Sequence, residues 1–130
     1  TGRFERERDP LPSIALTTDT SALTAISNDY AFENIFSRQI NGLGNKNDVF
    51  IGLTTSGKSK NILLALSTAK EKNIKTVSLC GSYSKELKKN SDYIITVPSS
   101  KTSRIQECHI LILHIICNLV EEKLYLERSE

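Results

Sequence analysis

The 130-residue sequence contains no Met, no Trp and only three Cys, at positions 80, 108 and 117. Three scattered cysteines without a CxxC pair give no basis for a disulfide framework or a cysteine zinc site, and they favour a reducing, cytoplasmic compartment. No apolar run approaches the roughly 20 residues of a membrane-spanning helix, and nothing near Thr1 resembles a signal peptide. The formal net charge is only +2, so neither nucleic acid nor a membrane is expected as a partner.

The missing Met also bears on the extent of the chain. A complete translation product begins with Met, whereas this chain begins at Thr1, so we expect a piece of a longer protein. The length suits one hydrophobic core. We therefore expect residues 1–130 to form a single domain.

Apolar segments of strand length and of helix length alternate along the chain. The predicted strands cover residues 13–18, 48–55, 75–79 and 93–97, and the predicted helices cover residues 19–27, 32–43, 59–72 and 102–126. Strands separated by helices are typical of a parallel sheet covered on both faces. The pattern therefore predicts an α/β fold, a three-layer αβα sandwich.

The segment TTSGKS, residues 54–59, follows the second predicted strand and precedes a predicted helix. Ligands of open parallel sheets bind beyond the carboxyl ends of the strands, and a helix N-terminus with nearby hydroxyls suits a phosphate group. The P-loop pattern GxxxxGK[ST] is absent, which favours a phosphorylated small molecule over a nucleoside triphosphate. The alternative is that these residues only cap the helix. The phosphate-binding candidates are Thr54, Thr55, Ser56 and Ser59.

Polar residues interrupt the apolar final helix at Gln106, His109 and His114. An isolated His on such a helix is most often a core or interface residue, and His109 and His114 lack the i,i+4 spacing of a bidentate metal pair. Gln106 and His114 are separated by about 12 Å of helix rise. If both residues bind one metal ion, they must therefore come from different subunits.

Several collinear segments resemble one family. They are residues 2–4 (GRF), 15–33 (ALTTDTSALTAISNDYAFE), 35–40 (IFSRQI), 55–57 (TSG) and 103–117 (SRIQECHILILHIIC). These segments are similar to the phosphoheptose isomerases, which are sugar isomerases of the SIS-domain family. The similarity extends over nearly the whole chain.

The resemblance implies a five-stranded, flavodoxin-like parallel sheet and a homotetramer with active sites between subunits. It implies conversion of sedoheptulose 7-phosphate to D-glycero-D-manno-heptose 7-phosphate, for lipopolysaccharide or capsule precursors. The 54–59 loop matches the family's phosphate loop, and Asn28 and Asp29 match substrate contacts. Gln106 matches a residue that contacts substrate and zinc, and His114 matches a zinc ligand and catalytic proton-transfer group.

The chain departs from the family pattern in three places. The upstream carboxylate, the upstream zinc-ligating His, and the first substrate loop with its helical segment have no counterpart in this chain, so we expect the chain alone to be inactive. The loop has Lys58 where the family usually has Asn. Residues 80–87 (CGSYSKEL) replace a glycine-rich turn, and we expect a changed backbone there.

Two non-catalytic alternatives share the same fold. One is a tetrameric protein binder that resembles the replication initiator-associating proteins, and the other is a regulatory domain that senses a sugar phosphate. As those binders are known, they lack a His at the position of His114, and a sensor has no need of one. His114 and Ser56 therefore favour the isomerase.

Overall fold

The computed structural model describes residues 2–127, with side chains up to residue 124. The helices are α1 (Thr20–Tyr30), α2 (Ile35–Leu43), α3 (Lys60–Glu71) and α4 (Thr102–Glu127). The strands are β1 (Val49–Thr54), β2 (Lys75–Cys80) and β3 (Tyr93–Thr96), and the short 3₁₀ turns are η1 (Phe32–Asn34) and η2 (Leu87–Lys89). No helix in this range is long and apolar enough to cross a bilayer.

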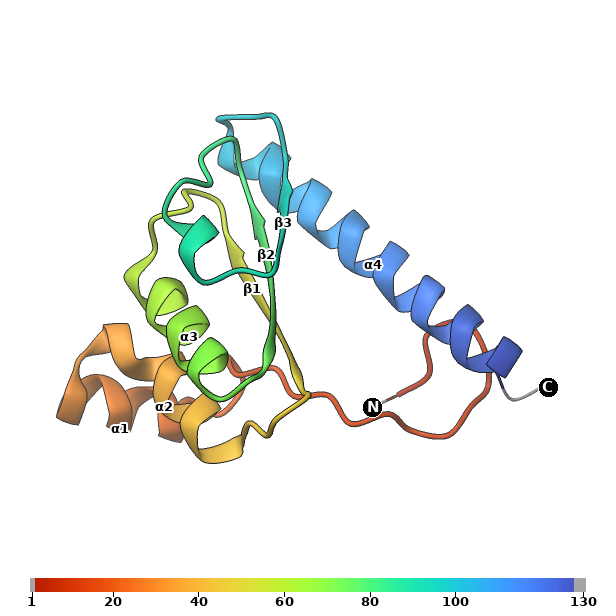
Figure 1. Cartoon of the computed structure of the whole chain (residues 1–130), viewed down its shortest axis with the longest axis horizontal. Helices are drawn as coiled ribbons and strands as arrows, with labels where there is room; N and C mark the ends of the chain where they lie inside the picture. The colour runs from red at the N-terminus through yellow and green to blue at the C-terminus, as the bar shows by residue number, and fades with distance from the viewer. Residues whose placement is uncertain (1, 128–130) are drawn as a thin grey trace.

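The three strands form one parallel sheet in the order β1-β2-β3. The register pairs Thr54 with Cys80 and Cys80 with Thr96, so the carboxyl ends of all three strands meet at one edge. Helices α1 to α3 lie on one side of the sheet, and α4 lies on the other (Figure 1). The described residues thus confirm the predicted αβα layering, with three of the five strands that the resemblance implies.

Helix α3 illustrates why these elements form. Its buried residues Ile62, Ala65, Leu66 and Ala69 recur at helical spacing and face the sheet and α2. Small alanines let α2 and α3 approach closely, and Ile40 and Ile74 complete that cluster. Ser59 precedes the helix with extended backbone angles, which sets where α3 begins relative to β1.

The predicted strand at residues 13–18 is wrong. Residues 13–15 belong to no helix or strand, and the Thr18 amide donates to the Ala15 carbonyl at 3.3 Å in a turn. The Gln39 side chain donates to the Leu16 carbonyl at 3.0 Å, which links this segment to α2. Apolar composition alone does not make a strand when no neighbouring strand supplies hydrogen bonds.

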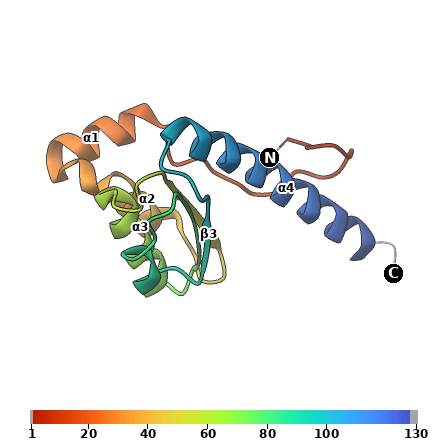
Figure 2. The same ribbon diagram turned by 90° about the horizontal axis from the view of Figure 1, so that it is seen from above.

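The far half of α4 extends beyond the sheet (Figure 1). Residues 2–12, which we call the N-terminal strap, run beside this part of the helix in both views (Figures 1 and 2). From the strap, the chain runs on to the start of α1 (Figures 1 and 2). Residues from the beginning of the described chain thus lie against its last helix.

Candidate active site

Three hydroxyls of the 54–59 loop, those of Thr54, Ser56 and Ser59, form hydrogen bonds with one another at the end of β1. Thr54 is 5% exposed, and its Oγ1 lies 2.9 Å from Ser59 Oγ and accepts the Gly57 amide at 3.2 Å. Ser56 Oγ lies 3.5 Å from Thr54 Oγ1 and accepts the Lys58 amide. The loop is therefore held in shape by its own side chains, and little ordering cost remains for a ligand.

Two glycines allow this loop and the turn after β2 to approach each other closely. Gly57 has a φ of +68°, and a Cβ there would stand 2.1 Å from the Tyr83 carbonyl oxygen. A Cβ on Gly81 would stand 2.6 Å from the Thr55 carbonyl oxygen, which accepts the Gly81 amide at 3.2 Å. Only glycine fits either position without displacing the neighbouring loop.

The turn at residues 80–87 needs no further glycine. Of the described residues, Gly57, Ala31, Asn47 and Asn73 are those with positive φ, and none of them lies in this turn. The glycines that the resemblance leads one to expect after Gly81 are therefore not required by the backbone seen here. Gly81 keeps the close approach that the loop contact demands.

The N-terminus of α3 opens beside the hydroxyls. Ser59 makes no side-chain capping bond and pairs with Thr54 instead. The capping alternative for Ser59 is therefore not observed. The Asn61 side chain accepts the Ile62 amide at 2.9 Å, but the amides of Lys60 and Asn61 at the start of the helix have no side-chain cap from Ser59. A helix start of this kind, next to several hydroxyls, is suited to bind an anion such as a phosphate group.

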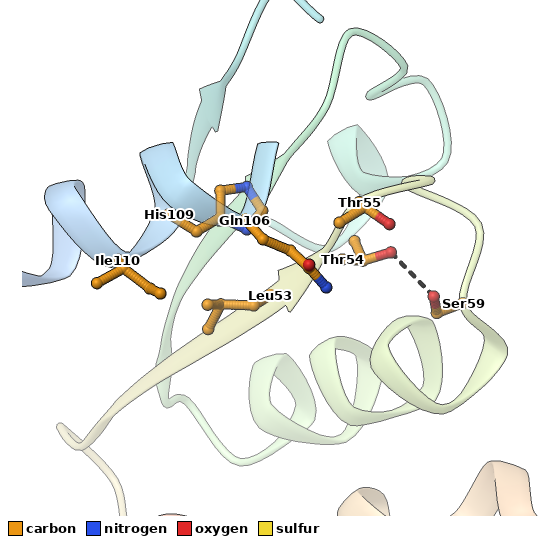
Figure 3. A pocket seen from close by; sticks show the side chains of 7 residues that line it. All are labelled: Leu53, Thr54, Thr55, Ser59, Gln106, His109 and Ile110. Atoms are coloured by element: carbon orange, nitrogen blue, oxygen red, sulfur yellow. Dashed lines mark hydrogen bonds between the residues drawn. The ribbon is translucent and has the colours of Figure 1, made fainter. Parts of the chain in front are cut away.

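An open cavity of about 520 Å³ lies between this loop and α4. Its lining consists of Leu53, Thr54, Thr55, Ser59, Gln106, His109 and Ile110. Figure 3 shows the Gln106 side chain extending from α4 toward the end of β1, where Thr54 and Ser59 are joined by their hydrogen bond. The cavity therefore brings Gln106 together with three of the four predicted phosphate-binding residues, and Ser56 adjoins them.

His109, for which the sequence predicts a core or interface position, is buried and also lines the cavity. It is 2% exposed, and its Nε2 has no hydrogen-bond partner within the described part of the chain. Burying a polar atom without a partner costs roughly 1–3 kcal/mol. Its place in the cavity wall follows from the i,i+3 spacing to Gln106, but the missing partner depends on how α4 packs on the sheet.

The remaining predicted residues lie outside this cavity. Asn28 and Asp29 are exposed near the end of α1, where the Asn28 amide donates to Asp29 at 2.8 Å. His114 is exposed on α4, and its ring centroid lies 5.6 Å from that of Phe4 in the strap. One chain therefore does not bring together all of the residues that the resemblance implies.

The two predicted zinc ligands, Gln106 and His114, are also not brought together within one chain. Gln106 faces the cavity, whereas His114, eight residues later on α4, faces the strap. Among residues 2–124, no group of three or more His, Cys, Asp or Glu side chains gathers that could hold a metal ion. Within one described chain, Gln106 and His114 thus lie in different surroundings, and their assignment to zinc stays a prediction.

Two further side chains, Lys58 and Cys80, lie in or next to the loop. The Lys58 ammonium lies 4.4 Å from the centre of the Tyr83 ring, so the exposed cation is held across the two loops. Cys80 is fully buried, and burial raises the pKa of its thiol. That shift keeps the thiol protonated and unsuited to act as a nucleophile.

The SIS domain family model matches residues 1–81 of the chain. A phosphoheptose isomerase from Sulfurimonas denitrificans is 53% identical over 124 residues, which cover 95% of this chain and 64% of the relative. A solved phosphoheptose isomerase from Francisella tularensis superposes with a TM-score of 0.88 at 40% identity, covering 93% of this chain and 65% of that one. The corresponding structure from Neisseria gonorrhoeae gives 0.81 at 42% identity, covering 84% and 61%.

The chain spans less than two thirds of the length of these relatives. The matches thus cover most of the present chain, but about a third of each relative has no counterpart in it.

Proposed function

Because the chain belongs to the SIS domain family, we propose that it carries the phosphate-binding part of an isomerase active site. The proposed reaction converts sedoheptulose 7-phosphate to D-glycero-D-manno-heptose 7-phosphate, a precursor of lipopolysaccharide or capsule. The observation that carries the proposal is the cavity in which Gln106 faces the hydroxyls of the 54–59 loop. Its lining combines the hydroxyls beside the N-terminus of α3 with the polar side chain of Gln106.

The phosphate end of the substrate would bind the loop. Thr55, Ser56 and Ser59 offer hydroxyl donors, and the first turn of α3 offers backbone amides and the positive end of its dipole. The exposed ammonium of Lys58 adds positive charge to the same loop. The sugar would then extend from the loop along the cavity toward α4.

The reacting end of the substrate needs a base and a group that polarises oxygen. Aldose–ketose isomerisation moves a proton between the first two carbons, and an imidazole suits that transfer because its pKa lies near neutrality. We assign this role to His114. Asn28 and Asp29 are assigned to sugar hydroxyls, and Gln106 to a substrate oxygen.

These residues meet in the proposal only if subunits combine. We propose a homotetramer in which the cavity of one subunit receives His114 of a neighbour, with zinc between Gln106 of one and His114 of the other. Zinc, when bound, would act as a Lewis acid on a substrate oxygen. We place the enzyme in the cytoplasm, which agrees with the free thiols of Cys80, Cys108 and Cys117.

The non-catalytic alternatives have less support. The relatives from Sulfurimonas denitrificans and Francisella tularensis both carry the name phosphoheptose isomerase, not that of a binding protein or sensor. His114 is also exposed, as a group that reacts with a substrate must be.

The test uses protein made from the complete reading frame that encodes this chain. It is incubated with sedoheptulose 7-phosphate, with and without zinc, and the aldose is followed by NMR. We expect zinc-dependent conversion that stops when a chelator is added and that is absent in His114→Ala. Cys117→Ala, an exposed change three residues further along α4, is the matched control and should retain activity. A folded tetramer that converts no substrate would contradict the proposal.

A further inference from the structure

Glu121 is a buried carboxylate that no part of the proposed reaction uses. It lies on α4 with 3% of its surface exposed. Its Oε1 accepts the Phe4 amide at 2.7 Å and Arg8 Nε at 2.7 Å, and its Oε2 accepts the amides of Glu5 at 2.9 Å and Arg6 at 3.0 Å. Each oxygen thus has two donors, all of them from the N-terminal strap.

Stability alone is a weak explanation for this arrangement. Removing a carboxylate from water costs several kcal/mol, and buried ion pairs often contribute no more than an apolar replacement would. What the carboxylate does supply is geometry, because three consecutive backbone amides converge on one charged group. Such charge-assisted bonds are short and directional, and they specify one backbone path for residues 4–6.

That path places an aromatic ring on His114. The Phe4 and His114 rings are 5.6 Å apart at their centroids, with their planes tilted by 49°. This separation and tilt lie within the range of favourable aromatic pairs. His114 is otherwise exposed on α4, so Phe4 is a neighbour that limits how its imidazole turns.

The helix links the two contacts. Glu121 follows His114 by seven residues, which brings both side chains within about 20° of the same face of α4. The strap runs beside this part of α4 (Figures 1 and 2) and contacts both Glu121 and His114, so the anchor and the ring contact belong to one surface. Without the hydrogen bonds to Glu121, the backbone of residues 4–6 would no longer be held where it places the Phe4 ring against His114.

We propose that Glu121 is a positioning residue for His114, acting through the strap and the ring of Phe4. This inference rests on the proposed function, because His114 is the proton-transfer group there. Glu121 itself touches no reacting atom. Its effect on catalysis is the orientation that it gives to the imidazole of His114.

The test compares Glu121→Gln with Glu122→Gln in protein from the complete reading frame. Both variants remove one negative charge from adjacent positions, but Glu122 is exposed and is not part of the anchor. We expect Glu121→Gln to lower kcat at least about tenfold with KM within about twofold, since small misplacements of a reacting group are costly. Phe4→Leu should lower kcat similarly, and the double variant should be no worse than the poorer single variant.

A second readout does not depend on turnover. In protein made with fluorophenylalanine, the ¹⁹F resonance that disappears in Phe4→Leu reports the ring on His114. Glu121→Gln should shift or broaden this resonance, and Glu122→Gln should leave it in place. This signal tests the link from anchor to ring even if the proposed reaction is not observed.

The outcomes separate the two proposals. Wild-type protein that binds substrate without converting it would contradict the proposed function, and the ¹⁹F signal would still decide whether Glu121 holds Phe4. Wild-type turnover combined with a normal kcat in Glu121→Gln would overturn the positioning role, even if the melting temperature fell. Strictly additive losses in the double variant would overturn the path through Phe4.

Discussion

The contact between the loop at residues 54–59 and the turn after β2 can be tested by adding one methyl group. Gly57→Ala places a Cβ at a residue with a φ of +68°, where it would stand 2.1 Å from the Tyr83 carbonyl oxygen. Real Cβ atoms essentially never approach an oxygen so closely. The loop or the Tyr83 backbone must therefore move.

The expected cost has two parts. A left-handed conformation costs a non-glycine residue roughly 1–2 kcal/mol. Relieving the overlap with Tyr83 adds about 1–3 kcal/mol, the usual cost of overpacking. The free energy of unfolding should therefore fall by about 2–5 kcal/mol, and the melting temperature by roughly 4 °C for each kcal/mol.

The matched control is Gly42→Ala. Gly42 lies in α2, and a Cβ there meets nothing within 4 Å. Because alanine is the better helix former, this variant should gain about 0.5–1 kcal/mol. Thermal and urea unfolding measure both values. A Gly57→Ala protein as stable as wild type, or equal losses in both variants, would refute the reasoning.

Three further predictions concern charge and the proposed base. Lys58→Asn removes the cation held over Tyr83 and should raise KM for the sugar phosphate about threefold or more at low salt. The control is Lys60→Asn, because the Lys60 ammonium lies 3.7 Å from the Glu33 carboxylate, and this change should alter KM less than about twofold. The backbone amide of Arg6 is the main cause that lowers the pKa of the Glu121 carboxyl from 4.5 to about 2. The contribution of ionised Glu121 to the free energy of unfolding is therefore complete above about pH 4.5 and is lost as the pH falls toward 2. Urea unfolding across this range should show the loss, and Glu121→Gln should remove this pH dependence. His114→Ala should abolish turnover, while the free energy of unfolding measured in urea should fall by no more than about 1 kcal/mol, because the side chain is exposed and its main loss is the ring contact with Phe4.

Local patterns were sufficient to predict most elements. β1, β2 and β3 are short segments rich in strand-forming residues, and α3 and α4 show helical spacing over more than two turns. The segment at residues 13–18 has the same composition as a strand but none of the required neighbours. A strand is a property of a pair of segments, so composition alone could not separate this segment from the true strands.

The grouping of hydroxyls in the 54–59 loop was also predictable, because these residues and Gly57 are adjacent in the chain. The rigidity of this loop was not, since it depends on the contact with Gly81 and Tyr83 from another loop. The unpartnered Nε2 of His109 likewise appears only once α4 is packed on the sheet. Sequence patterns located the groups, and tertiary contacts decided which of them are satisfied.

Glu121 shows why a charged residue near the end of a chain is easily misread. It stands in the run VEEK, which resembles an ordinary solvated stretch. Its seven-residue spacing from His114 was visible, but that spacing marks only a shared helix face. The burial comes from the strap, more than a hundred residues earlier in the chain.

The layout of α4 follows from a helix that is longer than the sheet it covers. Ile105, 3% exposed, would contact a Cβ on Gly81, and Gln106 and His109 face the cavity, so the first turns of α4 are packed on the sheet. Beyond the sheet, the apolar residues Ile115 and Leu119 are exposed, and the strap covers only the face that carries His114 and Glu121. Gln106 and His114 are thus separated both by helix rise and by what covers them. About 12 Å of helix rise lies between them, and in the described chain Gln106 lines the cavity while His114 lies beside Phe4.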